Sequence, residues 1–246
     1  MHLCAERKSP STIESYTIGV RMFLDYCESA GCPAVLDRPT VNAFVAGLLD
    51  SGAEAATARS RQLAVRRFSS WLAEEGETDR DELIGLKPPK LDEKVVPRLT
   101  DEQCRDLVKA CAGKDFIDRR DEAMVRFMLE TTARAGEVLG MSLPDVDITR
   151  GLAVIRRGKG GKGRPVPFGP YNGRALDPYL RVRRTHRLAE LPAFWLGGGG
   201  QRFGYHGLNV ALSRRARMAG IIAFTLTYCA TLPRNAGSPP RGPRVA

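Results

Sequence analysis

The sequence predicts a mainly α-helical protein of two domains, in which a small all-helical N-terminal domain precedes an α+β domain with a small antiparallel sheet. Three observations support this fold class. Apolar residues recur at helical spacing through most of the 246 residues. The stretch LKPPKLDEKVVPR at 86–98 has three prolines and no periodicity, so it separates two helical regions. Short β-like runs cluster only between residues 145 and 168.

The N-terminal domain, residues 1–86, is expected to hold three helices. The first is capped by Ser9 and ends near Gly31, and the second covers residues 40–49. The third covers residues 55–75 and is closed by Gly76. Its expected inward residues are Leu63, Phe68, Trp71 and Leu72, and its expected outward residues are Arg59, Arg61, Arg66 and Arg67.

A linker at 87–98 is expected to lead into the second domain, residues 99–220. Thr100 and Gln103 form a capping box that opens a helix through residue 112. A strongly apolar helix at 121–131 is expected at the centre of the core, followed by a short helix at 134–141. The runs DVDIT, LAVIRR and GRPVPF predict three strands, the last two joined by the turn GKGGK. Further helices are expected at 176–190 and 204–218, before the stop signal Ala219-Gly220.

Charge is distributed unevenly along the chain, whose formal net charge is +10. Residues 1–150 carry 21 basic and 26 acidic side chains, a net charge of −5. Residues 151–246 carry 17 basic and 2 acidic side chains, a net charge of +15. This excess attracts polyanions, and the phosphate backbone of nucleic acid is the first candidate. A solvated basic face, or neutralisation by the acidic half, is the structural alternative.

Several classes of protein are excluded by composition. No apolar run approaches the roughly 18 to 20 residues of a membrane span, and the N-terminus has no apolar signal-peptide core. We therefore expect a cytoplasmic protein without membrane contact. The six cysteines show no CxxC pair and no histidine at zinc-finger spacing, which favours reduced, buried thiols over a metal site.

The strings LETTARAGEVLGMSLPDVDI and IRRGKGGKGRPVPF resemble box I and the adjoining β-hairpin of the tyrosine recombinase (phage integrase) family. The segment SPSTIESY and the helices after it are similar to that family's SAM-like core-binding domain. VVPRLTDEQ resembles the entry to its catalytic domain. The resemblance covers about residues 9–220, and it implies two domains that clamp duplex DNA.

The resemblance also implies a reaction. Enzymes of this family cleave one DNA strand with a tyrosine hydroxyl, hold a 3′-phosphotyrosyl ester and reseal the strand, without metal, nucleotide cofactor or small-molecule substrate. Arg134 matches the first family arginine, whose planar fork can hold two nonbridging phosphate oxygens. Lys159 matches the lysine that protonates the leaving 5′-oxygen, and Lys162 is a phosphate contact. The other expected DNA contacts are Arg66, Arg67, Arg164, Arg214 and Arg215. The partner is double-stranded DNA, and a homo-oligomer on DNA is possible.

Each catalytic assignment has a purely structural alternative. Arg134 and Glu137 could form an ion pair at i,i+3 on a helix surface, worth a few tenths of a kcal/mol. Lys159 and Lys162 could be polar residues of a glycine-rich turn. The position of Arg134 between an apolar helix and a lysine-bearing hairpin favours the functional interpretation.

The family pattern breaks after Gly220. There the family has a His-x-x-Arg box, a later His or Trp and the nucleophilic Tyr, and the sequence shows none of them. His186 and His206 precede this region and are expected to be structural or surface residues. Tyr228 is the only later tyrosine, and its setting TLTYCATL does not resemble a nucleophile helix.

A change of reading frame accounts for this break. Residues 221–246 contain four prolines and no acidic residue, so they are expected to form an aberrant, disordered tail. If codons 221–230 all end in C, triplets that start from each third base encode HRLHPHLLRH, which contains a box of the family type. We therefore hypothesise that the chain is out of frame from about Ile221. A genuine but divergent C-terminus is the alternative.

The sequence therefore predicts site-specific DNA recombination or integration by descent, in a chain that is itself catalytically dead. A nonenzymatic DNA-binding remnant or decoy is the rival from another class. A basic regulator of unrelated fold is a third, weaker possibility, because no helix-turn-helix signature supports it.

Overall fold

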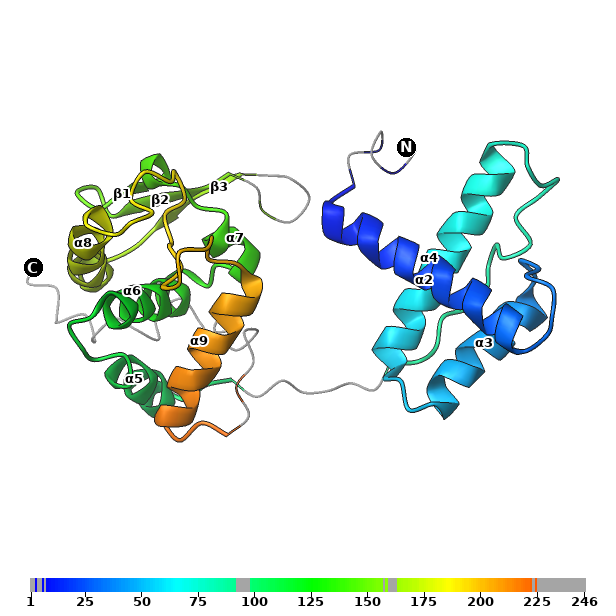
Figure 1. Cartoon of the computed structure of the whole chain (residues 1–246), viewed down its shortest axis with the longest axis horizontal. Helices are drawn as coiled ribbons and strands as arrows, with labels where there is room; N and C mark the ends of the chain where they lie inside the picture. Colours follow the sequence, from blue (N-terminus) through cyan, green and yellow to red (C-terminus); the bar gives the residue numbers. More distant parts are fainter. Residues whose placement is uncertain are drawn as a thin grey trace, which may run out of the picture. The chain divides into compact units, whose positions relative to one another are not determined.

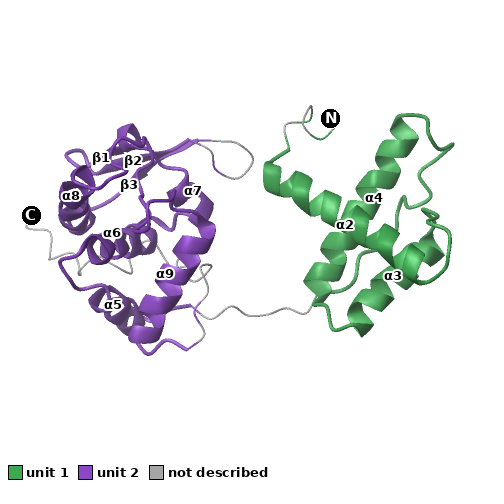
Figure 2. Cartoon of the chain, viewed as in Figure 1, with its two compact units in different colours: residues 1–94 green, residues 95–246 purple. Residues whose placement is uncertain are grey.

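The structure, a computed structural model, describes residues 3, 6, 8–91, 98–156, 158, 163–222 and 224. The chain divides into two compact units, residues 1–94 and 95–246, and each has its own hydrophobic core (Figure 2). Lys159, Lys162 and Tyr228 lie outside the described residues, as do most residues of the expected tail. Within the described ranges, no helix combines the length and the apolar character needed to cross a membrane.

Unit 1 is built from three long helices (Figure 1). They are α2 (Pro10–Ser29), α3 (Arg38–Asp50) and α4 (Ala55–Glu74). The Ser9 side chain accepts a hydrogen bond from the backbone N–H of Thr12, which confirms the predicted cap of α2. Asp37 caps α3 in the same way, by accepting from the N–H of Thr40. The predicted helical character of this region is confirmed.

The core of unit 1 lies between α2, α3 and α4. Phe23 and Phe44 meet edge to face with ring centroids 5.5 Å apart. The buried face of α4 consists of Ala58, Gln62, Ala64, Val65 and Ser69. The expectation that Leu63 points inward is wrong, since it is 40% exposed. Residues 58, 62, 65 and 69 recur every three or four positions and share one face, from which Leu63 is rotated away.

The described part of unit 2 contains five α-helices, one short 3-10 helix and a three-stranded sheet. Its elements are α5 (Asp101–Lys109), α6 (Phe116–Thr131), α7 (Ala135–Leu139), η1 (Leu143–Asp145), β1 (Val146–Asp147), β2 (Leu152–Ile155), β3 (Arg164–Pro167), α8 (Pro170–Arg184) and α9 (Tyr205–Met218). The sheet is antiparallel in the order β1-β2-β3, with Ala153 opposite both Val146 and Val166. The predicted mainly α fold with a small antiparallel sheet is confirmed.

Two helices of unit 2 start earlier than the sequence pattern indicated. α6 begins at Phe116, five residues before the first position of the apolar run. α8 begins at Pro170 and ends at Arg184, whereas residues 176–190 were expected. Pro170 occupies the first turn, where a missing N–H costs nothing, so Gly169-Pro170 is a start signal and not a break.

The core of unit 2 surrounds α6, which Figure 1 shows between the sheet and α5. Met124, Phe127 and Met128 on this helix are fully buried. Phe127 lies edge to face against Trp195, and Trp195 stacks on Tyr179 of α8. The Tyr179 hydroxyl donates to the Phe194 carbonyl and accepts from the Leu196 N–H. These contacts fix α6, whose C-terminal end carries the candidate site.

Candidate functional site

Arg134 stands at the junction between α6 and α7. Thr132 ends α6 in the left-handed conformation, with φ 52°, and is the one non-glycine residue with positive φ in the described part of the chain. Its N–H still donates to the Met128 carbonyl at 3.0 Å. This left-handed residue lies two positions before Arg134, and such strained positions are concentrated at functional sites. Arg134 is then the N-cap residue of α7.

A buried carboxylate holds Arg134 in place. Glu137 Oε2 accepts from the Arg134 backbone N–H at 2.9 Å, and Oε1 accepts from the Arg134 guanidinium at 3.3 Å. The same carboxylate accepts two hydrogen bonds from the guanidinium of Arg164 on β3, at 2.7 and 3.0 Å. The Glu137 side chain is 4% exposed, whereas that of Arg134 is 60% exposed. The i,i+3 pair therefore exists, but it belongs to a half-buried network and not to a helix surface.

The electrostatics of Glu137 favour its charged form. Burial by itself raises the pKa of Glu137, but hydrogen bonds from Arg164 and from the Arg134 backbone outweigh it, so the pKa lies below its ordinary value. In return, the hydrogen bond to Glu137 raises the pKa of Arg164. The two guanidinium groups together exceed the single negative charge of Glu137 by one.

A second buried carboxylate anchors the other strand of the hairpin. Asp145 accepts from the Arg156 guanidinium beyond the end of β2, and from the N–H and hydroxyl of Ser142. Burial raises the pKa of Asp145, but these hydrogen bonds outweigh it and leave the pKa below its ordinary value. Both strands of the hairpin that bears Lys159 and Lys162 are thus tied to the helical turns that follow Arg134.

This arrangement can bind an anion. The Arg134 side chain extends from a fixed backbone position, is mostly exposed and uses one terminal nitrogen for Glu137. Its remaining N–H donors are available to a planar or tetrahedral anion. Arg164 lies beside it on the same carboxylate, so the two guanidinium groups form one positively charged spot.

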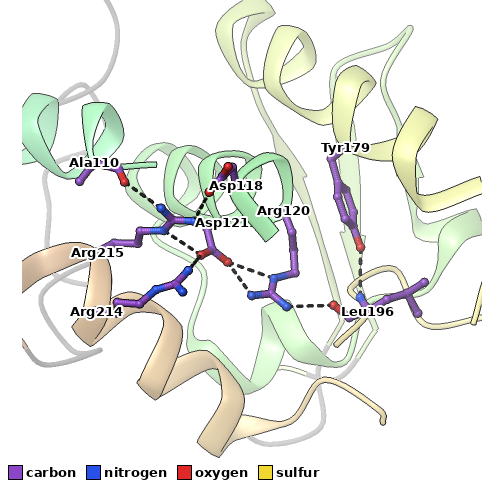
Figure 3. A network of polar contacts seen from close by, with 8 residues as sticks. All are labelled: Ala110, Asp118, Arg120, Asp121, Tyr179, Leu196, Arg214 and Arg215. Carbon is purple, nitrogen blue, oxygen red and sulfur yellow. Dashed lines mark hydrogen bonds and ion pairs between the residues drawn. The ribbon is translucent and has the colours of Figure 1, made fainter. Parts of the chain in front are cut away.

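Figure 3 shows a separate network in the core of unit 2, around Asp121 of α6. Asp121 accepts from Arg120 at 2.7 Å, from Arg215 at 2.9 Å and from Arg214 at 3.4 Å. The Arg215 guanidinium also donates to Asp118 and to the Ala110 carbonyl. The Arg215 side chain is only 4% exposed. Each of the three guanidinium nitrogens of Arg215 thus donates a hydrogen bond within the core, so we no longer propose Arg215 as a DNA contact.

The other expected DNA contacts occupy different environments. Arg214 is on the outer side of α9 with its side chain 51% exposed, and among the described residues its one ion pair is the long one to Asp121. On α4, Arg67 is exposed, whereas Arg66 is partly buried and its Nε has no hydrogen-bond partner among the described atoms. Arg67 borders a groove of about 530 Å³ between α2 and α4, together with the stacked rings of Phe68 and Trp71.

No cluster of three or more potential metal ligands occurs among the residues that the structure describes. Cys27, Cys104 and Cys111 are buried and free, and Cys32 is partly buried. Burial raises the pKa of the Cys111 thiol to about 12.

Sequence reasoning missed the roles of Glu137 and Asp121. Glu137 was considered only as a surface partner of Arg134, because the contact with Arg164 joins residues 27 positions apart. Asp121 interrupts an apolar helical run, and an acidic residue on a core-facing stripe is the signal that could have revealed a buried ion pair.

Comparison with known proteins agrees with this fold. The chain matches the model of the phage integrase family over residues 97–194 and that of the phage integrase N-terminal SAM-like domain over residues 1–76. Tyrosine recombinase XerC of Azotobacter vinelandii is 30% identical over 223 residues, which is 89% of this chain and 73% of that protein. XerC of Pseudomonas fluorescens is 29% identical over 222 residues, 89% of this chain and 72% of that protein.

Solved structures share the fold at low sequence identity. XerH recombinase bound to a palindromic difH substrate is similar with a TM-score of 0.71 and 16% identity, over 89% of this chain and 67% of that one. A lambda integrase (75–356) dimer bound to a COC′ core site gives a TM-score of 0.67 and 16% identity, over 94% of this chain and 80% of that one. The two family matches and the relationship to XerC proteins place this chain in the phage integrase family of tyrosine recombinases.

Proposed function

We propose that this chain is a DNA-binding member of a site-specific recombinase lineage that cannot complete strand exchange as its sequence stands. The observation that carries the DNA-binding part is the exposed guanidinium of Arg134, fixed by buried Glu137 beside Arg164. The titles of the similar XerH and lambda integrase structures describe them as bound to DNA, which supports duplex DNA as the partner. The lambda integrase is described as a dimer, and we propose that this chain also assembles on DNA.

Arg134 is the proposed anchor of the scissile phosphate. Its fork can donate two hydrogen bonds to nonbridging oxygens and stabilise the charge that develops when the phosphate is attacked. Lys159, on the hairpin turn, is the proposed acid that gives a proton to the leaving 5′-oxygen, and Lys162 contacts a neighbouring phosphate. Glu137 acts through Arg134 and is a positioning residue.

The wider DNA interface uses the exposed cations. Arg67, Arg164 and Arg214 are available at the surface of their units, and Arg66 contributes through its exposed portion. Arg214 is suited to a phosphate contact because Asp121 keeps two shorter ion pairs when Arg214 leaves. Arg215 has no part in this interface.

The proposed loss of DNA strand cleavage rests on the sequence after Gly220. A nucleophilic hydroxyl must be aimed in line with the scissile bond, and the family supplies it together with a second arginine and a histidine. The region after residue 220 has one tyrosine, Tyr228, in a setting unlike the family's, and no histidine. A change of reading frame near codon 221 explains both features, and the coding nucleotide sequence tests it.

The decisive experiment incubates the chain with suicide DNA substrates and resolves the products on a denaturing gel. The chain as written is expected to form no covalent adduct, whereas a version with its frame restored at codon 221 is expected to form one. In that restored protein Arg134→Ala should lower cleavage by at least about 10²-fold while most DNA affinity remains, because one phosphate contact among many is lost. An adduct of the original chain at Tyr228 would overturn the proposed loss of chemistry.

The second candidate is a purely nonenzymatic DNA-binding remnant or decoy, which the net charge of +15 in residues 151–246 favours. Affinity for duplex DNA should fall steeply between 50 and 200 mM salt, because each phosphate contact releases counterions. Fluorescence anisotropy titrations at the two salt concentrations measure this. Equal affinities at the two salt concentrations would remove the electrostatic part of the argument for DNA binding.

A further inference from the structure

The end of α2 brings two cysteines together through its backbone. Gly31 adopts a left-handed conformation with φ 62°, which closes the helix. The Cys32 N–H donates to the Cys27 carbonyl at 3.0 Å, and the Gly31 N–H donates to the Glu28 carbonyl at 3.1 Å. This is the paired hydrogen-bond pattern of a Schellman motif. A side-chain contact between the residues at the positions of Cys27 and Cys32 frequently accompanies this motif.

The distance is suitable for a covalent link. Standard bond lengths on either side of the 3.0 Å hydrogen bond limit the two Cα atoms to about 7 Å apart, which is the upper limit of the range that disulfides span. Cys32 packs against the core cluster that contains Cys27, and its thiol lies near enough to that of Cys27 to raise the pKa of Cys27. The bridge therefore needs little movement of the backbone.

The two sulfur atoms differ in accessibility. Cys27 is 1% exposed among Phe23, Val41 and Phe44, whereas Cys32 is partly exposed beyond the helix end. An external reagent can reach Cys32 only, and Cys27 can be reached only through Cys32. This is the arrangement of an attacking thiol with a buried resolving thiol.

We propose that Cys27 and Cys32 are a reversible dithiol–disulfide pair that is oxidised by low-molecular-weight disulfides. In the first step the Cys32 thiolate attacks the external disulfide, forms a mixed disulfide and releases one thiol. In the second step the Cys27 thiolate attacks the Cys32 sulfur, forms the intramolecular disulfide and releases the second thiol. The protein loses two electrons and two protons, and the external disulfide gains them as two thiols.

Burial and the hydrogen bond with Cys32 raise the pKa of Cys27. The thiolate is the reacting form, so oxidation should be slow at neutral pH and faster as the pH rises. This inference does not depend on DNA binding, and its test involves no nucleic acid.

The experiment treats the native full-length chain with glutathione disulfide, blocks free thiols and digests with trypsin. Arg38 is followed by Pro39, so cleavage at Arg21 and Arg59 releases one peptide that contains Cys27, Cys32 and no other cysteine. We expect this peptide to lose two hydrogen atoms in mass and to escape thiol blocking. The reaction should reverse with dithiothreitol.

A matched control separates the motif from mere proximity in sequence. The variant Cys32→Ser/Pro33→Cys keeps two thiols in the same peptide but moves one out of the Schellman position. Its disulfide should form at least about tenfold more slowly, because the native pair is held in reacting geometry. Cys32→Ser alone, at a partly exposed position, should abolish the mass loss and remain folded by circular dichroism.

Two results would overturn the proposal. One is a wild-type peptide that stays reduced, or stops at a glutathione adduct on Cys32, under conditions that oxidise the unfolded chain. The other is an equal rate in the Cys32→Ser/Pro33→Cys variant, which would show that the end of α2 does not position the thiols.

Discussion

Glu137 determines how the two arginines of the candidate site are held. It accepts from the Arg134 backbone, the Arg134 guanidinium and the Arg164 guanidinium, so one buried carboxylate connects a helix start to a strand. A carboxylate with this role is stabilising only while it is charged, because a protonated oxygen cannot accept from every donor. The site therefore has a pH dependence of its own.

Glu137→Gln should lower the free energy of unfolding by about 1–3 kcal/mol at pH 7, less than for a fully buried pair because the arginines are partly exposed. The pKa of Glu137 in the folded protein lies below its ordinary value of 4.5. Its contribution is therefore complete above pH 4.5 and is lost as the pH falls through the lower, folded-state pKa. Urea unfolding from pH 7 to pH 3 measures both effects, and the variant should lack this part of the acid destabilisation.

Asp177→Asn is the matched control, since Asp177 is half exposed and pairs with Arg181 on the surface of α8. It should change stability by less than about 0.5 kcal/mol. A cost for Glu137→Gln no larger than this would show that Glu137 does not organise the site.

The last turn of α9 is attached to two other helices at once. Arg215 bonds to Asp118 and Asp121 of α6 and to the carbonyl of Ala110 after α5, as Figure 3 shows. Adjacent Arg214 shares Asp121 but has its side chain half exposed. Two neighbouring arginines on one helix thus lie in different environments, Arg215 in the core and Arg214 at the surface.

Arg215→Met should lower the free energy of unfolding by about 3–5 kcal/mol, because it removes a buried cation that pairs with both Asp118 and Asp121. Arg214→Met should cost less than about 1 kcal/mol. DNA affinity should show the opposite order, with the larger effect for Arg214→Met. This variant should reduce the slope of log affinity against log salt concentration by about one. Urea unfolding and salt titrations of both variants measure this, and equal stability losses would contradict the assignment.

The crossing of α2 and α4 depends on small residues. A Cβ atom on Gly19 would collide with the Cβ of Ala64 and approach the Arg61 carbonyl to 3.3 Å. Gly19→Ala should therefore destabilise unit 1 by about 1–3 kcal/mol through overpacking. Adding Ala64→Gly should recover part of this loss in thermal unfolding, and a purely additive double variant would disprove the close contact.

The whole chain is a pair of separately packed units with unequal charge. Residues 1–94 have a net charge of −3 and residues 95–246 a net charge of +13. Electrostatic attraction to DNA is therefore expected chiefly from unit 2, and the proposed DNA contacts of unit 1 are limited to local clusters such as Arg66 and Arg67. Each unit keeps its own core, so they should be separable.

Limited trypsin digestion should cut first at Lys90, because Leu91 after it is 44% exposed and follows Leu86, the last residue of the unit 1 core along the chain. Two resistant fragments are expected, and the C-terminal one should elute from heparin at higher salt. Mass spectrometry identifies the fragments. Initial cleavage within α2, α4 or α6 would show that the units do not fold independently.

The sequence by itself determined the features that depend on neighbouring residues. The caps at Ser9 and Thr100, the helical periodicity and the antiparallel strands were predicted because each arises from contacts within a few positions. Arg134 is likewise proposed as a site residue from a local motif. The bounds of α6 and α8 were less well predicted, since tertiary packing extends helices beyond their apolar runs.

Only the tertiary structure decided which charged groups are buried. Arg214 and Arg215 are equivalent in the sequence, but Asp121, 94 positions away, takes Arg215 into the core. Glu137 likewise becomes a shared anchor through Arg164 on another element, and Leu63 is exposed because the α2–α4 crossing selects a different face. Burial is a property of elements that meet in space, and a pattern within one helix cannot specify its partners.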